Sequence, residues 1–286
     1  MAAPLKGRVA VVTGATSGIG RWTARALAAR GATTVIVGRS QSRAVATAAS
    51  IASETGNPEV FPFGVTDLAD RVEAARLATG LLDRYPRVHL LVHNAGAYYH
   101  RREVTREGLE RTLALNLLAP FIVTTRLLPR LIESAPSRVV FVASAAHRGQ
   151  HVDFDDLSGD RNYHGYRQYG RSKLEVILLA REFARRLHDL PVTSNAVHPG
   201  FVASGFGRAN GGGVGLGFAV AEALFGRRPR RAGEDVAFVA ADPAFDGITG
   251  QYVAHRTVRS GSADSRDMVA ALRLYEACAL LAKPYV

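Results

Sequence analysis

The chain has 286 residues, 47% of them hydrophobic and 21% charged, and its net charge is +11. This composition is ordinary for a soluble globular protein and excludes a disordered chain, and the length suffices to bury a large core. The positive charge raises nucleic acid or an anionic membrane surface as a partner, but the basic residues are scattered arginines with one dense cluster, Arg227 to Arg231. Since no nucleic-acid-binding motif accompanies them, we expect no nucleic acid as a partner.

The predicted elements alternate along the whole chain. Short β-branched apolar runs predict strands buried on both faces, at Val9–Val12, Thr33–Val37, Val60–Phe63, Leu90–Val92, Arg138–Val142, Val192–Val197 and Gln251–Val253. Helical periodicity predicts helices between them, over 19–30, 41–55, 68–84, 106–116, 119–134, 169–188, 234–241 and 266–282. The alternation predicts an α/β fold, a Rossmann-type doubly wound parallel sheet with helices on both faces. No repeat or long linker interrupts it, so we expect residues 1–286 to form a single domain.

The turn after the first predicted strand reads Thr13-Gly14-Ala15-Thr16-Ser17-Gly18-Ile19-Gly20. Gly14 and Gly18 permit backbone conformations and close approaches that a Cβ would block, and Gly20 permits tight packing of the helix on the strand. The positive end of the helix that begins near Ile19 then faces the pyrophosphate of a dinucleotide. A glycine pattern can also serve a purely structural turn, but its place between the first strand and a helix favours dinucleotide binding.

The second predicted strand ends at Val37-Gly38-Arg39-Ser40, where an NAD-selective protein commonly places a carboxylate that holds the ribose hydroxyls. This chain has none there. Arg39, with Ser40 and Arg43, instead offers a fork of donors suited to a 2′-phosphate, which favours NADP(H). The alternative is a solvated loop arginine.

Tyr169 and Lys173 are spaced four apart within a predicted helix, so their side chains project from the same face. A free phenol ionises only near pH ~10. We expect the Lys173 ammonium to lower the pKa of Tyr169, which makes the phenol a usable general acid or base. The same spacing also occurs on solvated helix faces, but with the glycine turn upstream it indicates redox chemistry.

Cys278 is the only cysteine, which excludes an internal disulfide and a cysteine-based zinc site, and its apolar helical surroundings predict a core residue. The N-terminus leads almost directly into the strand-like run at Val9. It holds no apolar stretch of the length that a signal peptide or membrane anchor needs. We therefore expect a cytoplasmic protein without a membrane span.

The motifs together resemble the short-chain dehydrogenase/reductase family. In the family's order they are Thr13-Gly14-x-x-x-Gly18-Ile19-Gly20, Asp67-Leu68, Asn94-Ala95-Gly96, Asn116, Ser144, Tyr169-x-x-x-Lys173 and Pro199-Gly200. Within the family the chain is most similar to the branch of retinol dehydrogenases and the WW domain-containing oxidoreductase. The supporting stretches are Asp153 to Leu157, Tyr169 to Leu174, Val197 to Gly200 and Gly250 to Tyr252. Two departures, Ala143 for a frequent serine and His93 for a frequent asparagine, remove no residue assigned to chemistry.

The resemblance implies catalytic roles for four residues. Ser144 would hydrogen-bond the substrate oxygen, and Tyr169 would give that oxygen a proton or take one from it. Lys173 would lower the phenol pKa and hold the nicotinamide ribose, and Asn116 would support a water that passes protons to Lys173. Purely structural roles remain open for Ser144, as the end of a strand, and for Asn116.

The resemblance also implies cofactor contacts beyond the glycine turn. Asp67 and Leu68 would border the adenine, and Asp67 can equally cap the helix that begins at Leu68. Asn94 and Gly96 would lie at the adenine ribose and the adjoining backbone. The contacts implied at the nicotinamide are Pro199, Gly200 and Val202.

Two segments are expected to shape the substrate entrance. A polar insertion between Ser144 and Tyr169 has no standard metal-ligand spacing, so we expect no metal site there; its chemistry-bearing residues are His147, His151, Asp153, Asp155, Asp156, Tyr163 and His164. The segment of about 203–232 holds three glycines in a row and apolar residues, as a substrate lid would. A lid over Tyr98, Tyr99 and His151 suits a lipophilic substrate, including a cyclic one, whereas a helix packed on the core is the alternative.

These inferences predict an NADP(H)-dependent oxidoreductase that acts on a ketone, aldehyde or secondary alcohol of a lipophilic small molecule. Excess NADPH in cells favours carbonyl reduction. Two alternatives remain: a net non-redox biosynthetic step at the same site, and a non-catalytic cofactor-sensing or scaffold protein. Helices 106–134 and 169–188 resemble those by which family members pair, so a homo-oligomer and a monomer both stay open.

Overall fold

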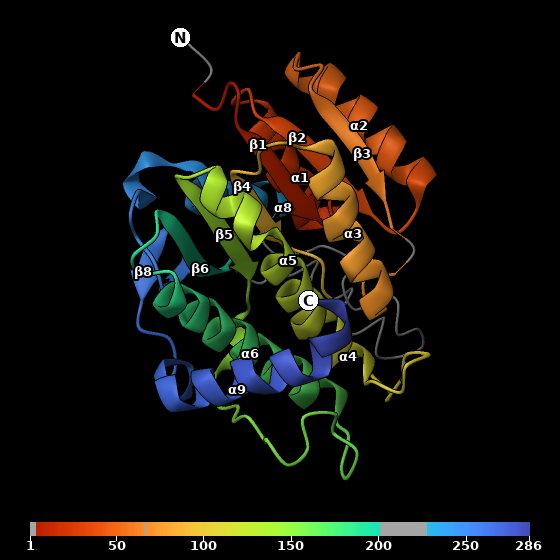
Figure 1. Ribbon diagram of the computed structural model, residues 1–286, viewed down its shortest axis with the longest axis vertical. Helices are drawn as coiled ribbons and strands as arrows, with labels where there is room; N and C mark the ends of the chain where they lie inside the picture. Colours follow the sequence, from red (N-terminus) through yellow and green to blue (C-terminus); the bar gives the residue numbers. More distant parts are fainter. Residues whose placement is uncertain (1–3, 66, 201–227) are drawn as a thin grey trace.

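One sheet carries every strand of the described chain. The structure is a computed structural model that describes residues 4–65, 67–200 and 228–286 (Figure 1). Within these residues the sheet has eight strands in the order β3-β2-β1-β4-β5-β6-β7-β8. They are β1 (Val9–Thr13), β2 (Thr33–Gly38), β3 (Val60–Gly64), β4 (Leu90–His93), β5 (Ser137–Val142), β6 (Val192–His198), β7 (Tyr252–Ala254) and β8 (Thr257–Arg259). All neighbours from β3 to β7 pair in parallel, which confirms the predicted doubly wound sheet.

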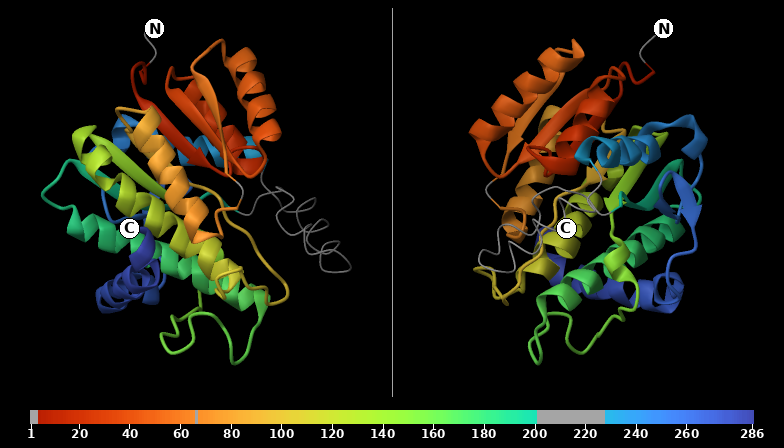
Figure 2. Two further views of the ribbon diagram at one scale, coloured as in Figure 1. Left: turned by 45° about the vertical axis from the view of Figure 1, so that its right-hand side comes forward. Right: turned by 180° about the vertical axis from the view of Figure 1, so that it is seen from behind.

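Helices cover both faces of this sheet (Figure 2). They are α1 (Gly18–Ala28), α2 (Gln41–Thr55), α3 (Arg71–Arg84), α4 (Arg111–Leu113), α5 (Ala119–Glu133), α6 (Gly165–Arg186), α8 (Pro229–Ala241) and α9 (Met268–Ala282). A π-helical turn, η1 (Ala114–Leu118), joins α4 to α5. Helices α3, α5 and α6 bury their apolar sides in one core, with α9 outside against α6, and α1, α2 and α8 bury theirs in the other.

The two cores explain why the central strands are apolar at nearly every position. Successive side chains of a strand point to opposite faces, so Val11 enters one core while Ala10 and Val12 enter the other. The continuous β-branched runs that predicted the strands are therefore a direct consequence of helices on both sides of the sheet.

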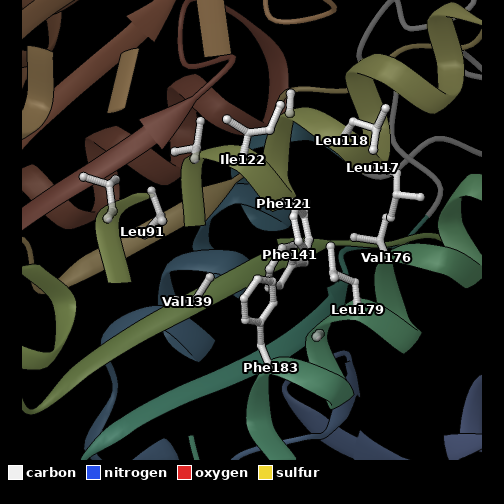
Figure 3. Packing of buried hydrophobic residues seen from close by; sticks show 14 of the residues in the cluster. Leu91, Leu117, Leu118, Phe121, Ile122, Val139, Phe141, Val176, Leu179 and Phe183 are labelled. Carbon is white, nitrogen blue, oxygen red and sulfur yellow. The ribbon is translucent and has the colours of Figure 1, made fainter. Parts of the chain in front are cut away.

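Three phenylalanines, Phe121, Phe141 and Phe183, join α5 and α6 to the sheet (Figure 3). Phe141 of β5 stacks on Phe183 of α6 with ring centroids 6.1 Å apart, and Phe121 of α5 lies 6.0 Å from Phe183. Such aromatic pairs add about 0.5–1.5 kcal/mol beyond the area that they bury. They fix the position of α6, the helix that carries Tyr169 and Lys173.

In the described part of the chain, the stretch Arg111–Glu133 is the one helix long and apolar enough to cross a membrane, by length and composition alone. Of its most apolar window, 72% is buried within the protein. The helix therefore uses its apolar side chains for the core.

Two predicted helices begin later than expected because a carboxylate caps them. The prediction of a helix over 106–116 is wrong for its first turn, since the Glu110 carboxylate accepts hydrogen bonds from the Thr112 and Leu113 amides, each at 2.8 Å. The helix expected from Leu68 begins at Arg71, where Asp70 accepts from the Val72 amide at 2.8 Å. Asp67 is therefore not the cap of α3.

Two other helices begin earlier than expected. His164 caps α6 by accepting from the Arg167 amide, so the helix starts at Gly165 rather than at Tyr169. Helix α8 starts at Pro229 rather than at 234, because proline is well suited to the first position of a helix. Residues 229–232, at the end of the predicted lid, thus form the first turn of α8.

The sheet edges account for the two remaining differences. β8 was not predicted, and it pairs antiparallel with β7 through a two-residue turn at His255 and Arg256, with φ of 53° and 61°. Hairpins of this kind usually have asparagine or glycine at these two positions, and neither residue type occurs there in this chain. The prediction that β3 is buried on both faces is wrong, since it is an edge strand and Phe61 is 43% exposed.

Candidate active site

A cleft of about 610 Å³ opens where the carboxyl ends of the central strands meet. This is where ligands bind in open parallel sheets, at the point where the strand order reverses, here between β1 and β4. Most of the predicted site residues line the cleft: Gly14, Thr16, Ser17, Gly18, Ile19, Gly20, Arg39, Leu68, Asn94, Gly96, Ser144, Tyr169, Lys173, Pro199 and Gly200.

The glycine turn is shaped by positions that a side chain would block. Gly14 and Gly18 have φ of 65° and 53°, the left-handed region that favours glycine. A Cβ on Gly14 would lie 2.9 Å from the Cα of Ala95, and one on Gly20 would lie 2.4 Å from the carbonyl oxygen of Gly14. Gly20 is therefore required by the turn itself, where the sequence had suggested contact with the strand.

The start of α1 is suited to an anionic group. Within the described residues, its N-cap Ser17 makes no side-chain hydrogen bond to the helix, and the first turn contains no acidic residue. The first amide N–H groups of α1 thus stay available to a ligand, and the helix dipole places positive potential at the same point.

Asn94 and Thr13 hold the glycine turn to the loop after β4. The Asn94 side-chain amide donates to the carbonyl oxygens of Thr13 at 2.9 Å and Gly14 at 3.2 Å. The Thr13 hydroxyl accepts from the amides of Asn94 at 3.1 Å and Ala95 at 3.0 Å. Thr13 was not predicted as a functional residue, and only its place before Gly14 in the motif could have indicated it.

At the end of the cleft beyond β2, Arg39 and Arg43 contribute the cationic side chains and Leu68 an apolar wall. Ser40 and Asp67 are not among the described residues that line the cleft. Ser40 caps α2 by accepting from the Arg43 amide, and Asp67 pairs with Arg111 of α4. Their contacts with a cofactor stay predictions.

Ser144, Tyr169 and Lys173 meet at the opposite end of the cleft. Ser144 lies just after β5 and caps the 3-10 turn η2 (Ala145–His147), where its hydroxyl accepts from the Ala146 amide at 3.2 Å. Tyr169 makes a side-chain hydrogen bond with Ser144. The Lys173 ammonium lies 5.7 Å from the centroid of the Tyr169 ring and donates to the carbonyl oxygen of Val142 at 2.9 Å.

The prediction that the Tyr169 pKa is lowered is wrong, since the net shift caused by the surrounding protein is upward. Burial raises the pKa of Tyr169 to about 12, against the opposing hydrogen bond with Ser144. Burial also lowers the pKa of Lys173 to about 8. Both shifts have one cause, because removal from water disfavours the charged form of either group, and the amine donates to a backbone carbonyl rather than to the phenol.

Asn116 lies in the π-helical turn η1, a local distortion frequent at functional sites. Its carbonyl oxygen accepts from the Ala97 amide at 2.9 Å, and its amide donates to the Ala97 carbonyl and the Ser172 hydroxyl, each at 3.0 Å. A Cβ on Gly96 would lie 3.2 Å from the Asn116 oxygen and 3.3 Å from the Lys173 nitrogen. Asn116 and Lys173 are thus close neighbours across Gly96, and the water relay between them stays a prediction.

Sequence reasoning missed several residues of the cleft. They are Tyr166, Leu115 and His198. Tyr98, which the sequence had indicated, also lines the cleft and meets the Tyr169 ring edge-on at 6.2 Å. Tyr166 is three residues before Tyr169, one helical turn away, which could have indicated it. Leu115 could not be found in this way, since its position depends on the π-helical turn.

The histidines of the polar insertion between Ser144 and Tyr169 lie apart from one another. His151 is exposed and pairs with Asp264, and His164 caps α6, so neither joins the cleft. His147 is fully buried behind Ser144. Tyr99 lies under the guanidinium of Arg111, and its expected place beneath the lid stays a prediction. In residues 4–65, 67–200 and 228–286 no group of three metal-ligating side chains comes together. Val202 and the predicted lid up to residue 227 lie outside the described residues.

Known proteins with a similar sequence include short-chain dehydrogenases and retinol dehydrogenases. A family model described as short chain dehydrogenase matches residues 8–214. The chain is 42% identical over 285 residues to dehydrogenase/reductase SDR family member 13 of Bos taurus, which covers 98% of this chain and 74% of that protein. It is 42% identical over 200 residues to retinol dehydrogenase 12 of Bos taurus, over 70% of this chain and 63% of that protein.

A bacterial relative and a solved structure extend this similarity. A candidate daunorubicin C-13 ketoreductase of Streptomyces sp. strain C5 is 36% identical over 281 residues, which cover 96% of this chain and 92% of that protein. RhlG of Pseudomonas aeruginosa, solved as an active-site complex with NADP, superimposes with a TM-score of 0.71 and 28% identity over 89% of this chain and 96% of that chain. This chain therefore belongs to the short-chain dehydrogenase/reductase family of NAD(P)(H)-dependent oxidoreductases, in its retinol dehydrogenase branch.

Proposed function

We propose that the protein is an NADP(H)-dependent reductase for a ketone or aldehyde of a lipophilic small molecule. The observation that carries this is the placement of Ser144, Tyr169 and Lys173 at one end of a cleft whose other end is formed by a glycine turn and two arginines. The corresponding alcohol would be the substrate of the reverse reaction.

The cleft fits a dinucleotide. The turn around Gly14 and the first amides of α1 would hold the pyrophosphate, and the Cβ contacts above leave no room for a side chain at Gly14 or Gly20. Arg39 and Arg43 would hold a 2′-phosphate, since guanidinium groups match phosphate geometry. Lys173 and the Pro199-Gly200 segment would border the nicotinamide. When bound, NADP(H) supplies or accepts the hydride.

The chain's own residues handle the proton. With a pKa of about 12, Tyr169 keeps its proton at neutral pH, as a proton donor to a carbonyl oxygen must. Ser144, hydrogen-bonded to Tyr169, is placed to donate to the same oxygen and so stabilise the developing negative charge. The Lys173 ammonium lies 5.7 Å from the centroid of the phenol ring, and its attraction for the phenolate that proton donation leaves is smaller than the cost of burying that phenolate.

The wall of the cleft beside Tyr169 supports a lipophilic substrate. Tyr98, Tyr166 and Leu115 present two aromatic rings and an aliphatic side chain there. Relatives named for retinol and for a C-13 ketone agree with this choice.

The decisive test is Tyr169→Phe. We expect the variant to bind NADPH as the wild type does and to lose turnover by at least about 100-fold, because general acid catalysis contributes about 10²–10⁴-fold. Oxidation of NADPH, followed by its absorbance with carbonyl compounds of increasing size, measures this. Wild-type protein that binds no NADPH, or turns substrate over without consuming it, would reject the proposal in favour of a scaffold or a non-redox enzyme.

The cofactor preference has a separate test. Arg39→Asp should weaken NADPH binding while NADH binding stays equal or improves, because a carboxylate repels the 2′-phosphate and can hold ribose hydroxyls. Arg87→Asp makes the same charge change at an exposed position outside the cleft and serves as the control. Dissociation constants for both nucleotides, measured by titration, decide; an unchanged preference in Arg39→Asp contradicts the 2′-phosphate assignment.

A further inference from the structure

We infer that His147 is a positioning residue that fixes the orientation of Ser144 through the backbone. The inference rests on the proposed function, in which Ser144 touches the reacting oxygen. His147 ends the 3-10 turn that Ser144 caps, and it is fully buried.

The contacts of the imidazole define its protonation. Its Nδ1 lies 2.7 Å from the carbonyl oxygen of Ser144, which can only accept, so Nδ1 carries the proton. The backbone amide of His147 donates to the same oxygen at 3.3 Å. The other ring nitrogen, Nε2, is buried and has no hydrogen-bond partner among the residues that the structure describes. The ring meets that of Tyr252 edge-on at 4.9 Å.

This arrangement keeps the ring neutral. Burial lowers the pKa of His147, and a second proton would sit on Nε2, where the described chain offers no acceptor. The imidazole is thus a permanent single donor, aimed at one carbonyl.

The carbonyl that it holds controls the Ser144 hydroxyl. The turn lies directly on α6, since a Cβ on Gly170 would be 2.6 Å from the carbonyl oxygen of Ala146. Gly170 adjoins Tyr169, the hydrogen-bond partner of Ser144. With its carbonyl held by His147 and its hydroxyl hydrogen-bonded to Tyr169, Ser144 is fixed at its backbone and at its side chain. His147 therefore acts on the site without reaching the substrate.

Three variants at position 147 separate the donor from the bulk of the ring. His147→Phe keeps a planar ring and removes the donor, His147→Asn places an amide nitrogen near the position of Nδ1, and His147→Gln places it near Nε2. We expect His147→Phe to lower kcat about 10- to 100-fold at unchanged NADPH affinity, because a small misplacement of a catalytic group costs up to about 100-fold. His147→Asn should recover most of this loss and His147→Gln little.

A double-mutant cycle with Ser144→Ala tests the route of the effect. If His147 acts through Ser144, His147→Phe should cause no further loss of kcat once the hydroxyl is absent. The inference would be overturned if the loss of kcat in the double variant equalled the product of the two single losses, or if His147→Asn and His147→Phe had equal activity. A general loss of stability would lower all variants alike and would not follow this pattern.

The tautomer of His147 can be measured independently of enzyme activity. In imidazole nitrogen NMR of the wild-type protein, the His147 signals, assigned by their absence in His147→Asn, should show a protonated Nδ1. A protonated Nε2 would overturn the inference even in an active enzyme. Wild-type protein without any turnover would reject the proposed function, whereas an active wild type matched by His147→Phe would reject the positioning role alone.

Discussion

At the scale of single residues, burial moves the pKa values of the Tyr169 phenol and the Lys173 amine apart. The pKa of Tyr169 is raised to about 12 and that of Lys173 is lowered to about 8. A helix spacing of four could indicate that the two side chains are neighbours, but the direction of the Tyr169 shift depends on how much water the fold removes. Neutral phenol and a weakly basic amine suit a site that donates a proton at neutral pH.

The Lys173 shift can be observed directly, because Lys6, Lys173 and Lys283 are the only lysines. In protein labelled with ¹³C at lysine Cε, we expect one resonance to titrate near pH 8, with the ammonium below that pH and the neutral amine above it. That resonance should vanish in Lys173→Met. A spectrum in which no resonance titrates between about pH 7 and 9 would contradict the burial of the amine.

At the scale of elements, α6 carries a buried carboxyl group that the site does not use. Glu175 is fully buried, and neither carboxylate oxygen has a hydrogen-bond partner in the described part of the chain. Burial raises its pKa to about 8, with Arg171 opposing and Glu110 adding to the shift. Cys278 of α9 is close enough that Glu175 adds to its raised pKa, so the carboxyl group lies toward the α6–α9 contact (Figure 1).

Glu175→Gln should therefore raise the free energy of unfolding. The native state keeps the Glu175 proton up to about pH 8, whereas the unfolded chain releases it near pH 4.5, so this group costs stability increasingly as pH rises between these values. We expect a gain on the order of a few kcal/mol at pH 7 that shrinks toward pH 5, measured by urea denaturation.

Glu182→Gln is the matched control on the same helix. Burial raises the pKa of Glu182, but hydrogen bonds from Arg185 and Arg186 outweigh it and hold the pKa below its ordinary value. This carboxylate stabilises the fold above the unfolded pKa, so its replacement should lower stability at pH 7 and have less effect as the pH falls. Equal effects of the two substitutions would contradict the assignment of opposite roles.

At the scale of the whole molecule, the cleft is a product of strand order. β1 lies between β2 and β4. The loop after β1 leads to α1 on one face of the sheet, whereas the loop after β4 leads toward α5 on the other face. The diverging loops leave a cleft above β1, with the glycine turn on one side and Ser144 and Tyr169 on the other. Residues from 14 to 200 thus meet in one place, although each is anchored by its own strand or helix.

The amino-acid sequence by itself determined the layered fold and most of the residues of the site. Val9–Thr13 and the other buried strands are apolar at both faces, and the glycines and Tyr169–Lys173 occupy positions where local geometry leaves few alternatives. Local patterns could not show how far each group is removed from water. Only the tertiary structure decided that Asp67 pairs with Arg111, that β8 closes a hairpin, that the Tyr169 pKa rises and that His147 holds Ser144. The Asp67–Arg111 pair joins segments far apart in the chain, and packing by the whole fold sets how far Tyr169 and His147 are removed from water.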